Sequence, residues 1–281
     1  MNDFLDKNRF SVYSNSKGNL LKTEYQKDGL IHFVKTGRMQ LRDFPGYWGI
    51  EPIIEVICFR LGWLMGLDMA EQTLSILSGK RYDKEILTFI CDSPDFRQGK
   101  SIVYLQTLYI QDRRYLDFDF LCRNTGATDL INMLTFDLII MNEDRHNGNV
   151  AWLTNDDGSL KMTPIFDNGY SLLYDDIRGM LKDYKKAASF CLCNSPLYQE
   201  NFSYAERLLC RLSKIYEPTI RLDISELEIH KIIQTTRLEY KELLNSQINN
   251  LAVPEEWWER TEDFIKWRLD HVRALRYNME G

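Results

Sequence analysis

The sequence predicts an α+β fold with two lobes, in which a small antiparallel sheet precedes a larger helical lobe. Two observations carry this prediction. The first third of the chain holds short β-prone runs separated by turn residues, and the last quarter holds long segments with helical apolar periodicity. We expect the first lobe to span residues 1–91 and the second residues 92–281, with a hinge near Phe89–Cys91.

The small lobe begins with three short β-prone runs. They are Arg9–Tyr13, Leu20–Tyr25 and Leu30–Lys35, and they are separated by the turn-forming segments Ser14–Asn19 and Lys27–Gly29. Runs this short, joined by turns this tight, predict a three-stranded antiparallel meander.

A helix is predicted next, opening at Pro52 and running to about Gly66. Proline is well tolerated at the first helical position, because its missing N–H would have no partner there. The apolar residues that follow form one broad stripe: Ile53, Val56, Ile57, Leu61 and Leu64. Leu74–Leu77 and Glu85–Cys91 are predicted to add two more strands to the sheet.

The second lobe is predicted to be mainly helical. A first helix covers Asp129–Met141 behind a Thr128 or Asp129 cap. A hairpin then pairs Val150–Leu153 with Lys161–Ile165 across an Asn-, Asp- and Gly-rich loop. The C-terminal quarter predicts packed helices at Tyr204–Ser213, Glu226–Leu244 and Glu255–Tyr277.

Composition and charge narrow the classes of function. The 281 residues are 44% hydrophobic and 27% charged, as in an ordered globular chain of one two-lobed unit or two modest domains. A formal net charge of -6 would repel a polyphosphate backbone, so nucleic acid is a poor direct partner. The sequence shows no signal peptide, no membrane-spanning run and no C-x-x-C pair among its six cysteines. We expect a cytoplasmic protein with reduced thiols, while secretion as an effector by a signal-less route stays open.

Two acidic motifs flank the hairpin. Met141–Asn149 reads M-N-E-D-R-H-N-G-N, and Pro164–Gly169 reads P-I-F-D-N-G. The hairpin would bring Asp144, Asn149 and Asp167 to one end, where an amide oxygen and a carboxylate can chelate Mg²⁺ while the other carboxylate faces an acceptor hydroxyl. Taken alone, the first motif could also be an ordinary turn that follows a helix and has no catalytic role.

The motifs resemble those of a known family. N-x-D-R-H-x-x-N and P-I-F-D-N-G are similar to the catalytic and metal motifs of HipA-type serine/threonine kinases, and best match the short stand-alone CtkA-like proteins, whose metal motif also reads F-D-x-G. The D-R-H-x-x-N core is also similar to that of phosphoinositide 3-kinase relatives. The resemblance implies a bilobal protein-kinase-like fold, ATP and Mg²⁺ as cofactors, and a Ser or Thr of a protein, including the chain itself, as acceptor.

The same resemblance implies a role for each motif residue. Asn149 and Asp167 would bind the metal, and Asp144 would orient the acceptor hydroxyl. An imidazole is by its usual chemistry a better general base than a carboxylate, so the choice between Asp144 and His146 as the base stays open. Arg145 would orient the loop or contact phosphate.

Two residues of the small lobe complete the expected nucleotide site. Lys35 ends the alternation L-I-H-F-V-K and shares a strand face with Ile31 and Phe33, as expected of a lysine reaching phosphates beside an apolar adenine pocket. The spacing of Glu55 in the helix that follows is similar to that of the family's helix glutamate, which pairs with the lysine. Glu51 is better explained as an N-terminal cap or helix-dipole partner.

Backbone N–H groups of Ser16, Lys17 and Gly18 would cover the phosphates, although this loop holds only one glycine where G-x-G-x-x-G is usual. The family is regulated by phosphorylation of a serine in this loop, which here would be Ser14 or Ser16. Ile90 and Cys91 would contact the adenine at the hinge.

Tyr170–Gln199 would correspond to the activation loop and carries several basic residues. Three rivals stay open. A lipid or small-molecule kinase would share the same machinery, a nucleotide-binding pseudokinase would act as a toxin, antitoxin partner or effector module, and a metal-dependent phosphohydrolase is the most remote of the three. A regulatory partner protein also stays open. Transfer of phosphate to a protein would separate the first reading from all three.

Overall fold

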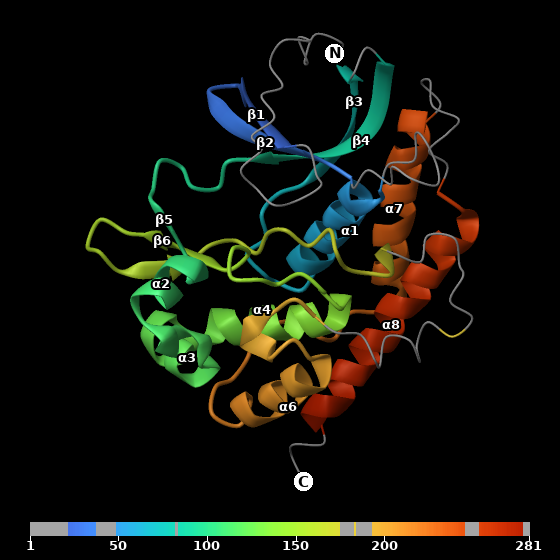
Figure 1. The fold of residues 1–281 in the computed structure, drawn as a ribbon. Helices are drawn as coiled ribbons and strands as arrows, with labels where there is room; N and C mark the ends of the chain where they lie inside the picture. The colour runs from blue at the N-terminus through green and yellow to red at the C-terminus, as the bar shows by residue number, and fades with distance from the viewer. Residues whose placement is uncertain are drawn as a thin grey trace.

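The computed structural model describes residues 22–37, 49–81, 84–174, 183, 193–244 and 253–277. It shows a small antiparallel sheet above a larger helical lobe (Figure 1), which confirms the predicted α+β architecture. The sheet contains four strands in the order β1-β2-β4-β3. Their bounds are β1 Lys22–Lys27, β2 Leu30–Thr36, β3 Thr73–Arg81 and β4 Lys84–Pro94.

Two strands of the predicted meander are confirmed as β1 and β2, while Arg9–Tyr13 lies outside the described residues. Their turn is Asp28–Gly29, and both residues have positive φ, 51° and 81°. That conformation matches the right-handed twist of a hairpin, which explains the Asp-Gly pair. The register places Lys35 of β2 opposite Lys22 of β1 on one side and Cys91 of β4 on the other.

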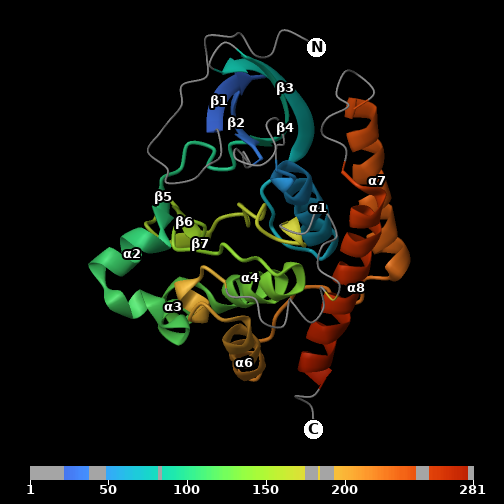
Figure 2. The ribbon, with the colours of Figure 1, turned by 45° about the vertical axis from the view of Figure 1, so that its right-hand side comes forward.

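Helix α1 (Glu51–Leu64) lies directly beneath this sheet (Figure 2). Pro52 stands at its start, as predicted, and Ile53, Ile57 and Leu61 are buried in the main core. The helix is buried on nearly all sides because β4 packs above it and α7 beside it. Glu55 therefore points from a rigid element into the protein interior.

The helical lobe is built around α4 (Ala127–Ile140), whose residues from Leu130 to Ile140 are all buried. The predicted Thr128 or Asp129 cap was wrong, because Gly126 with φ 106° turns the chain and the helix begins at Ala127. The three C-terminal helices are confirmed. The other α-helices among the described residues are α2 Leu105–Gln111, α3 Phe118–Thr125, α6 Phe202–Leu212, α7 Glu226–Leu244 and α8 Glu255–Tyr277.

The predicted hairpin is confirmed as β6 (Ala151–Thr154) and β7 (Leu160–Met162), and β5 (Ile102–Tyr104) adds a third strand to it. Strand β7 is shorter than expected. Ile165 leaves the hairpin and instead forms a parallel bridge with Met69, in the segment after α1. The chain between β7 and Asp167 is thereby drawn toward α1.

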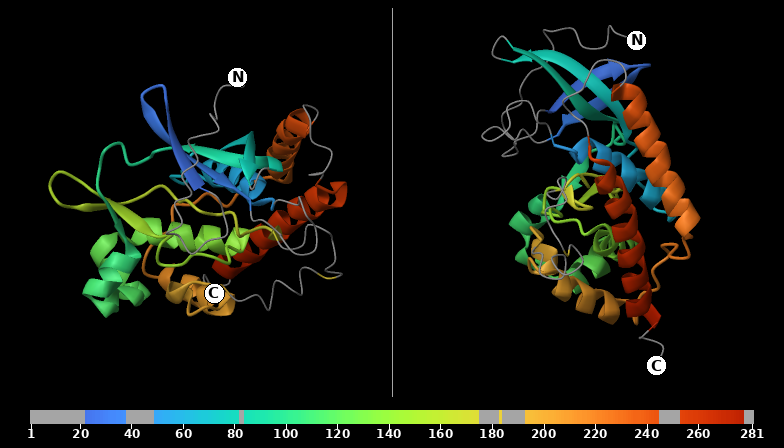
Figure 3. Two further views of the ribbon diagram at one scale, coloured as in Figure 1. Left: turned by 45° about the horizontal axis from the view of Figure 1, so that its top comes forward. Right: turned by 90° about the vertical axis from the view of Figure 1, so that its right-hand side faces the viewer.

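Helices α7 and α8 run along one side of the molecule, and α7 reaches the level of α1 and the sheet (Figure 3). Arg60 of α1 donates to both carboxylate oxygens of Glu239 at 2.6 and 2.7 Å and to Oγ1 of Thr236 at 2.8 Å. The ring centroids of Phe89 and Tyr240 lie 5.2 Å apart. The C-terminal part of the chain thus fixes the small lobe against the helical one.

The predicted hinge residues Phe89–Cys91 lie within β4, which continues to Pro94. Asp95 still donates its N–H to the carbonyl of Ile31 at 2.7 Å, so the connection to the helical lobe follows Asp95. The division at residues 91 and 92 stays a prediction. Within the described ranges, no helix has the length and apolarity needed to cross a membrane, and the five described cysteines are free thiols.

Candidate active site

Lys35 joins the two lobes by direct contacts. Its Nζ donates to Oε1 of Glu55 at 2.9 Å and to Oδ1 of Asp167 at 2.6 Å. The lysine comes from β2, the glutamate from α1, and the aspartate from the loop after β7. Two carboxylates that lie 20 and 132 positions from Lys35 in the sequence therefore meet at its ammonium group.

Glu55 holds the metal motif as well as the lysine. Its Oε2 accepts the backbone N–H of Asn168 at 2.9 Å, and its side chain is only 2% exposed. Gly169 follows, and a Cβ there would come within 3.0 Å of Cβ of Glu51. A glycine suits this position of the F-D-N-G motif because the chain runs close against the first turn of α1, where a Cβ would be tightly packed. Glu51 itself is buried in that first turn.

Asp167 has a φ of 60°, a left-handed conformation that costs energy for a non-glycine residue. The bonds on either side, from Lys35 to its carboxylate and from Asn168 to Glu55, hold it there. Such strain is usual where a side chain must be aimed precisely enough for function.

The catalytic-loop candidates are ordered by their own backbone. Asn142 accepts the N–H of Asp144 on Oδ1 at 2.9 Å, and the Nδ2 of Asn149 donates to the carbonyl of Asp144 at 2.8 Å. With its nitrogen used in this way, the amide of Asn149 keeps an oxygen that accepts no hydrogen bond from the described residues and could bind a ligand. Nδ1 of His146 accepts the N–H of Gly148 at 2.9 Å, while its Nε2 lies 3.8 Å from Oδ2 of Asp144.

Arg145 links the two acidic motifs. One nitrogen, Nη1, donates to the carbonyls of Asn149 at 3.1 Å and Phe166 at 2.7 Å, and Nη2 donates to Oδ1 of Asn168 at 2.7 Å. Since a single nitrogen bonds both carbonyls, Asn149 and the residue preceding Asp167 lie side by side. The side chain is fully buried, so of the two predicted roles the structure supports orienting the loop over contacting phosphate.

Asp137 of α4 is the counter-charge of Arg145 and was missed as a site residue. It accepts from Nε and Nη2 of Arg145 at 2.9 to 3.2 Å, and from the hydroxyl of Tyr198 at 2.7 Å. All three side chains are fully buried. A signal did exist, because an acid inside the apolar run L-T-F-D-L-I-I must find a buried partner.

Neighbouring opposite charges determine the protonation states of Asp167 and Lys35. Burial alone would raise the pKa of Asp167, but the Lys35 ammonium and, more distantly, Lys22 outweigh it and lower that pKa below its usual range. Burial would likewise lower the pKa of Lys35, and the carboxylates of Asp167 and Glu55 raise it well above normal. Both groups are therefore charged at neutral pH. Lys22, which faces Lys35 across β1 and β2, was not predicted to contribute.

The oxygen ligands present suit Mg²⁺. Within the described part of the chain, no cluster of three or more His, Cys, Asp or Glu side chains could hold a metal ion alone. Mg²⁺ is commonly bound by one or two carboxylates together with substrate phosphates and water. Arg145 brings the backbone of Asn149 and that of the residue before Asp167 together, and an amide oxygen and a carboxylate from these two positions fit that pattern.

Aromatic side chains lie beside this cluster. The rings of Phe96 and Phe166 are 5.7 Å apart, and the guanidinium of Arg97 lies 5.1 Å from the ring centre of Phe33. Phe33 stands two residues before Lys35, on the same face of β2, as the alternation predicts. The segment after β4 thus meets both the sheet and the metal motif.

The predicted adenine contacts fall on opposite faces of β4. Cys91 packs beside Lys35, with its Sγ 3.8 Å from the Lys35 carbonyl oxygen, whereas Ile90 packs with Val34 on the other face. The predicted phosphate-loop residues Ser16, Lys17 and Gly18 lie outside the described residues, as does Ser14.

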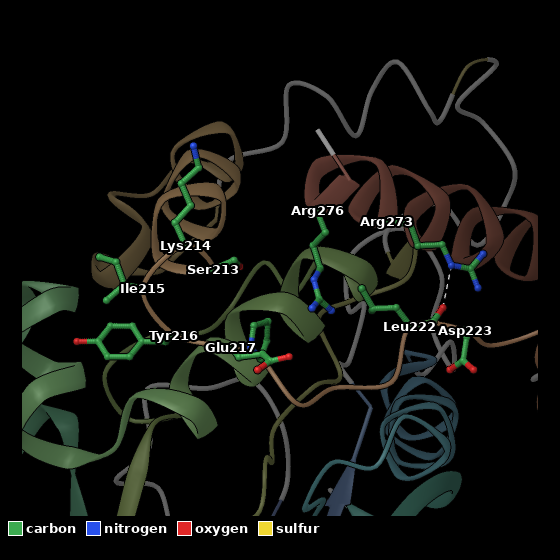
Figure 4. A pocket seen from close by; sticks show the side chains of 10 residues that line it. Ser213, Lys214, Ile215, Tyr216, Glu217, Leu222, Asp223, Arg273 and Arg276 are labelled. Carbon is green, nitrogen blue, oxygen red and sulfur yellow. Dashed lines mark hydrogen bonds between the residues drawn. The ribbon is translucent and has the colours of Figure 1, made fainter. Parts of the chain in front are cut away.

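A cavity of about 1010 Å³ lies elsewhere, between the segment after α6 and the C-terminal half of α8 (Figure 4). Its lining mixes charges of both signs, including Lys214, Glu217, Asp223 and Arg276. It contains none of the predicted site residues.

Comparisons with known proteins support the fold. No family model matches the sequence, and no curated protein matches it. Among solved structures, the proinflammatory kinase CtkA of Helicobacter pylori matches with a TM-score of 0.56 and 18% identity, covering 94% of this chain and 93% of that one.

Two other structures show weaker likeness. HipA of Shewanella oneidensis MR-1, in a toxin–antitoxin complex with HipB and operator DNA, has a TM-score of 0.48 and 15% identity, covering 98% of this chain and 69% of that one. WaaP, solved with acyl carrier protein, has a TM-score of 0.38 and 11% identity, covering 92% and 86%. The fold assignment rests on the first match. The chain has the same fold as CtkA, the kinase-like fold that the resemblance of its two acidic motifs predicted.

Proposed function

We propose that the protein is an ATP- and Mg²⁺-dependent serine/threonine kinase of the HipA/CtkA type. The observation that carries the proposal is the convergence of five polar groups. Lys35 bonds Glu55 and Asp167 at once, and Arg145 joins the backbone at Asn149 to the backbone preceding Asp167. A salt bridge that only stabilises the fold needs two opposite charges, whereas here an amide, two acids and a lysine come together from four separate elements.

Each residue has a distinct task in this reading. Lys35, held by Glu55, binds the nucleotide phosphates, and Asn149 and Asp167 hold the metal. Mg²⁺, when bound, draws negative charge from the phosphates and thereby favours attack on the γ-phosphorus. Lys35 bonds Asp167 directly here, so binding of the nucleotide would require the ammonium to share or exchange that partner.

Asp144 orients the acceptor hydroxyl and takes its proton. Its carboxylate is 28% exposed, so an incoming hydroxyl can reach it. The hydroxyl oxygen bonds the γ-phosphorus as the bond from that phosphorus to the β–γ bridging oxygen breaks, ADP leaves, and the hydroxyl proton passes to Asp144. His146, more exposed and already accepting from Gly148, is assigned a supporting role in holding the turn.

ATP would lie between the proposed lobes, residues 1–91 and 92–281. The adenine would sit under Phe33 and near Cys91, because these share the sheet face of Lys35. Ile90 faces the other side and is a weaker candidate for this contact.

The class of acceptor is tested by incubating the protein with ATP labelled on the γ-phosphate. Parallel reactions contain the protein alone, dephosphorylated casein, and phosphoinositide vesicles. A protein kinase labels itself or the casein on Ser or Thr, and a lipid kinase labels only the vesicles. Release of free phosphate without a labelled acceptor indicates a phosphohydrolase, and absence of turnover indicates a pseudokinase. Asp144→Ala is the control that must remove the label.

A further inference from the structure

Asn194 contacts the proposed catalytic loop with both its backbone and its side chain. Its N–H donates to the carbonyl of Glu143 at 2.6 Å, and its Nδ2 donates to Oδ1 of Asp144 at 2.8 Å. Two bonds to successive residues fix where Asn194 stands relative to the loop. The residue lies fifty positions after Asp144, in the segment that the sequence relates to an activation loop.

The two oxygens of the Asp144 carboxylate are in different situations. Oδ1 accepts from Asn194, whereas Oδ2 accepts no hydrogen bond from the residues that the structure describes, and Nε2 of His146 is 3.8 Å away. Asn142, which accepts the N–H of Asp144, and Asn149, which donates to its carbonyl, bond only the backbone of Asp144. The orientation of the carboxylate therefore depends on Asn194.

The segment that carries Asn194 is rigidly built. The N–H of Cys193 donates to the carbonyl of Glu200 at 3.3 Å, and the N–H of Glu200 returns to the carbonyl of Ser195 at 3.0 Å. A short 3-10 helix, η3 (Pro196–Tyr198), lies between them, and Tyr198 is fully buried with its hydroxyl on Asp137.

The same segment thus touches the site twice. Through Tyr198 it bonds Asp137, the partner of Arg145, and through Asn194 it bonds Asp144. Gln199 and Glu200 both have left-handed φ, 48° and 56°, a cost that such fixed contacts offset.

We propose that Asn194 is a positioning residue for phosphoryl transfer. Its amide holds Oδ1 of Asp144, so that Oδ2 faces the acceptor hydroxyl and receives its proton. The proposal rests on the proposed kinase function and goes beyond it, because it makes the orientation of the acceptor-binding acid depend on the docking of residues 193–200. Asn194 touches neither Lys35 nor Asp167 in the described contacts, so nucleotide binding does not depend on it.

Asn194→Asp and Asn194→Ala test this, with Asn201→Asp as the matched control. Aspartate has the size of asparagine but cannot donate, and it places a second carboxylate against Asp144. Asn201 caps α6 by accepting the N–H groups of Ser203 and Tyr204, a role that aspartate fills equally well. The measurements are the rate of labelled-phosphate transfer at saturating Mg-ATP, the Kd for Mg-ATP and the melting temperature.

Asn194→Ala should slow transfer by about 10- to 100-fold, the effect of losing a hydrogen bond to a charged group. Asn194→Asp should be slower still, because the two carboxylates repel. Both should keep the wild-type Kd, and Asn201→Asp should match the wild type throughout.

The proposal is overturned if Asn194→Asp transfers as fast as the wild type, or if both variants weaken Mg-ATP binding by the same factor as they slow transfer. The latter result would mean that residue 194 only supports the fold. If the wild type itself labels no acceptor, the kinase assignment fails and this proposal with it. A wild type that labels its acceptor beside an unaffected Asn194→Asp removes only the role of Asn194.

Discussion

Arg145→Lys should destabilise the protein strongly although it keeps the charge. The buried guanidinium donates to both oxygens of Asp137, to the carbonyls of Asn149 and Phe166, and to the amide oxygen of Asn168. An ammonium has three donors and no planar fork, so it cannot reach all of these acceptors.

The magnitude follows from the acceptors left behind. We expect the two backbone carbonyls to lose their donor, because the shorter lysine would stay with the Asp137 carboxylate. Each buried acceptor without a partner costs about 1–3 kcal/mol, which predicts a loss of about 4 kcal/mol in the free energy of unfolding. Transfer activity should fall as well, since the same bonds hold Asn149 beside the metal motif.

Urea denaturation followed by tryptophan fluorescence measures the change. Arg221→Lys is the matched control, because Arg221 makes its pairs with Asp223 and Glu228 on the surface, where exchange for lysine changes little. If Arg145→Lys unfolds at the same urea concentration as Arg221→Lys, the bonds of the buried arginine do not hold the two motifs together.

Three further predictions concern the contacts around Lys35. Lys35→Met should slow phosphoryl transfer by at least about 100-fold, measured with labelled ATP, because the phosphates lose their fixed cation. The pair also predicts a pH window. The lowered pKa of Asp167 adds stability that is fully present above the unfolded carboxyl pKa of about 3.9 and is lost as the pH falls from there through the lower folded pKa. The raised pKa of Lys35 adds stability that is fully present below the unfolded lysine pKa of about 10.4 and is lost as the pH rises through the higher folded pKa. The difference in melting temperature between wild type and Lys35→Met should therefore be greatest near neutrality and shrink at both extremes; a constant difference from acid to base would contradict the pairing. Glu239→Arg should slow phosphoryl transfer and have a smaller effect on the free energy of unfolding, because the new arginine repels Arg60 and displaces the helix that carries Glu55. Equal transfer rates in Glu239→Arg and wild type would show that α7 does not hold α1 in place.

Much of the fold could be predicted because the local signals agree with the tertiary structure. The Asp-Gly turn, the proline at the start of α1 and the apolar stripes of α7 and α8 each favour the element that formed. The start of α4 was misplaced because the sequence offers two good capping residues just inside the helix. The glycine before them, which can take a positive φ at no cost, decides the boundary.

The site was predictable in its motifs but not in its connections. Asp144, Asn149 and Asp167 sit in recognisable patterns, strand alternation pointed to Lys35, and the resemblance to the kinase family pointed to Glu55. Tyr198 and Asn194 lie far along the chain from the groups that they bond, and no local pattern marks them. Such contacts depend on how a segment docks, which a single sequence does not encode locally.

In the proposed active site, Lys35, Asn149 and Asp167 together bind Mg-ATP. Calorimetric titration of Mg-ATP into the wild type and into Asp167→Asn measures this binding, because the variant keeps the shape of the side chain and removes its charge. The site predicts measurable binding to the wild type that depends on Mg²⁺, and an affinity at least about tenfold lower for Asp167→Asn. Equal affinity for the two proteins, or no heat of binding with the wild type, would contradict it.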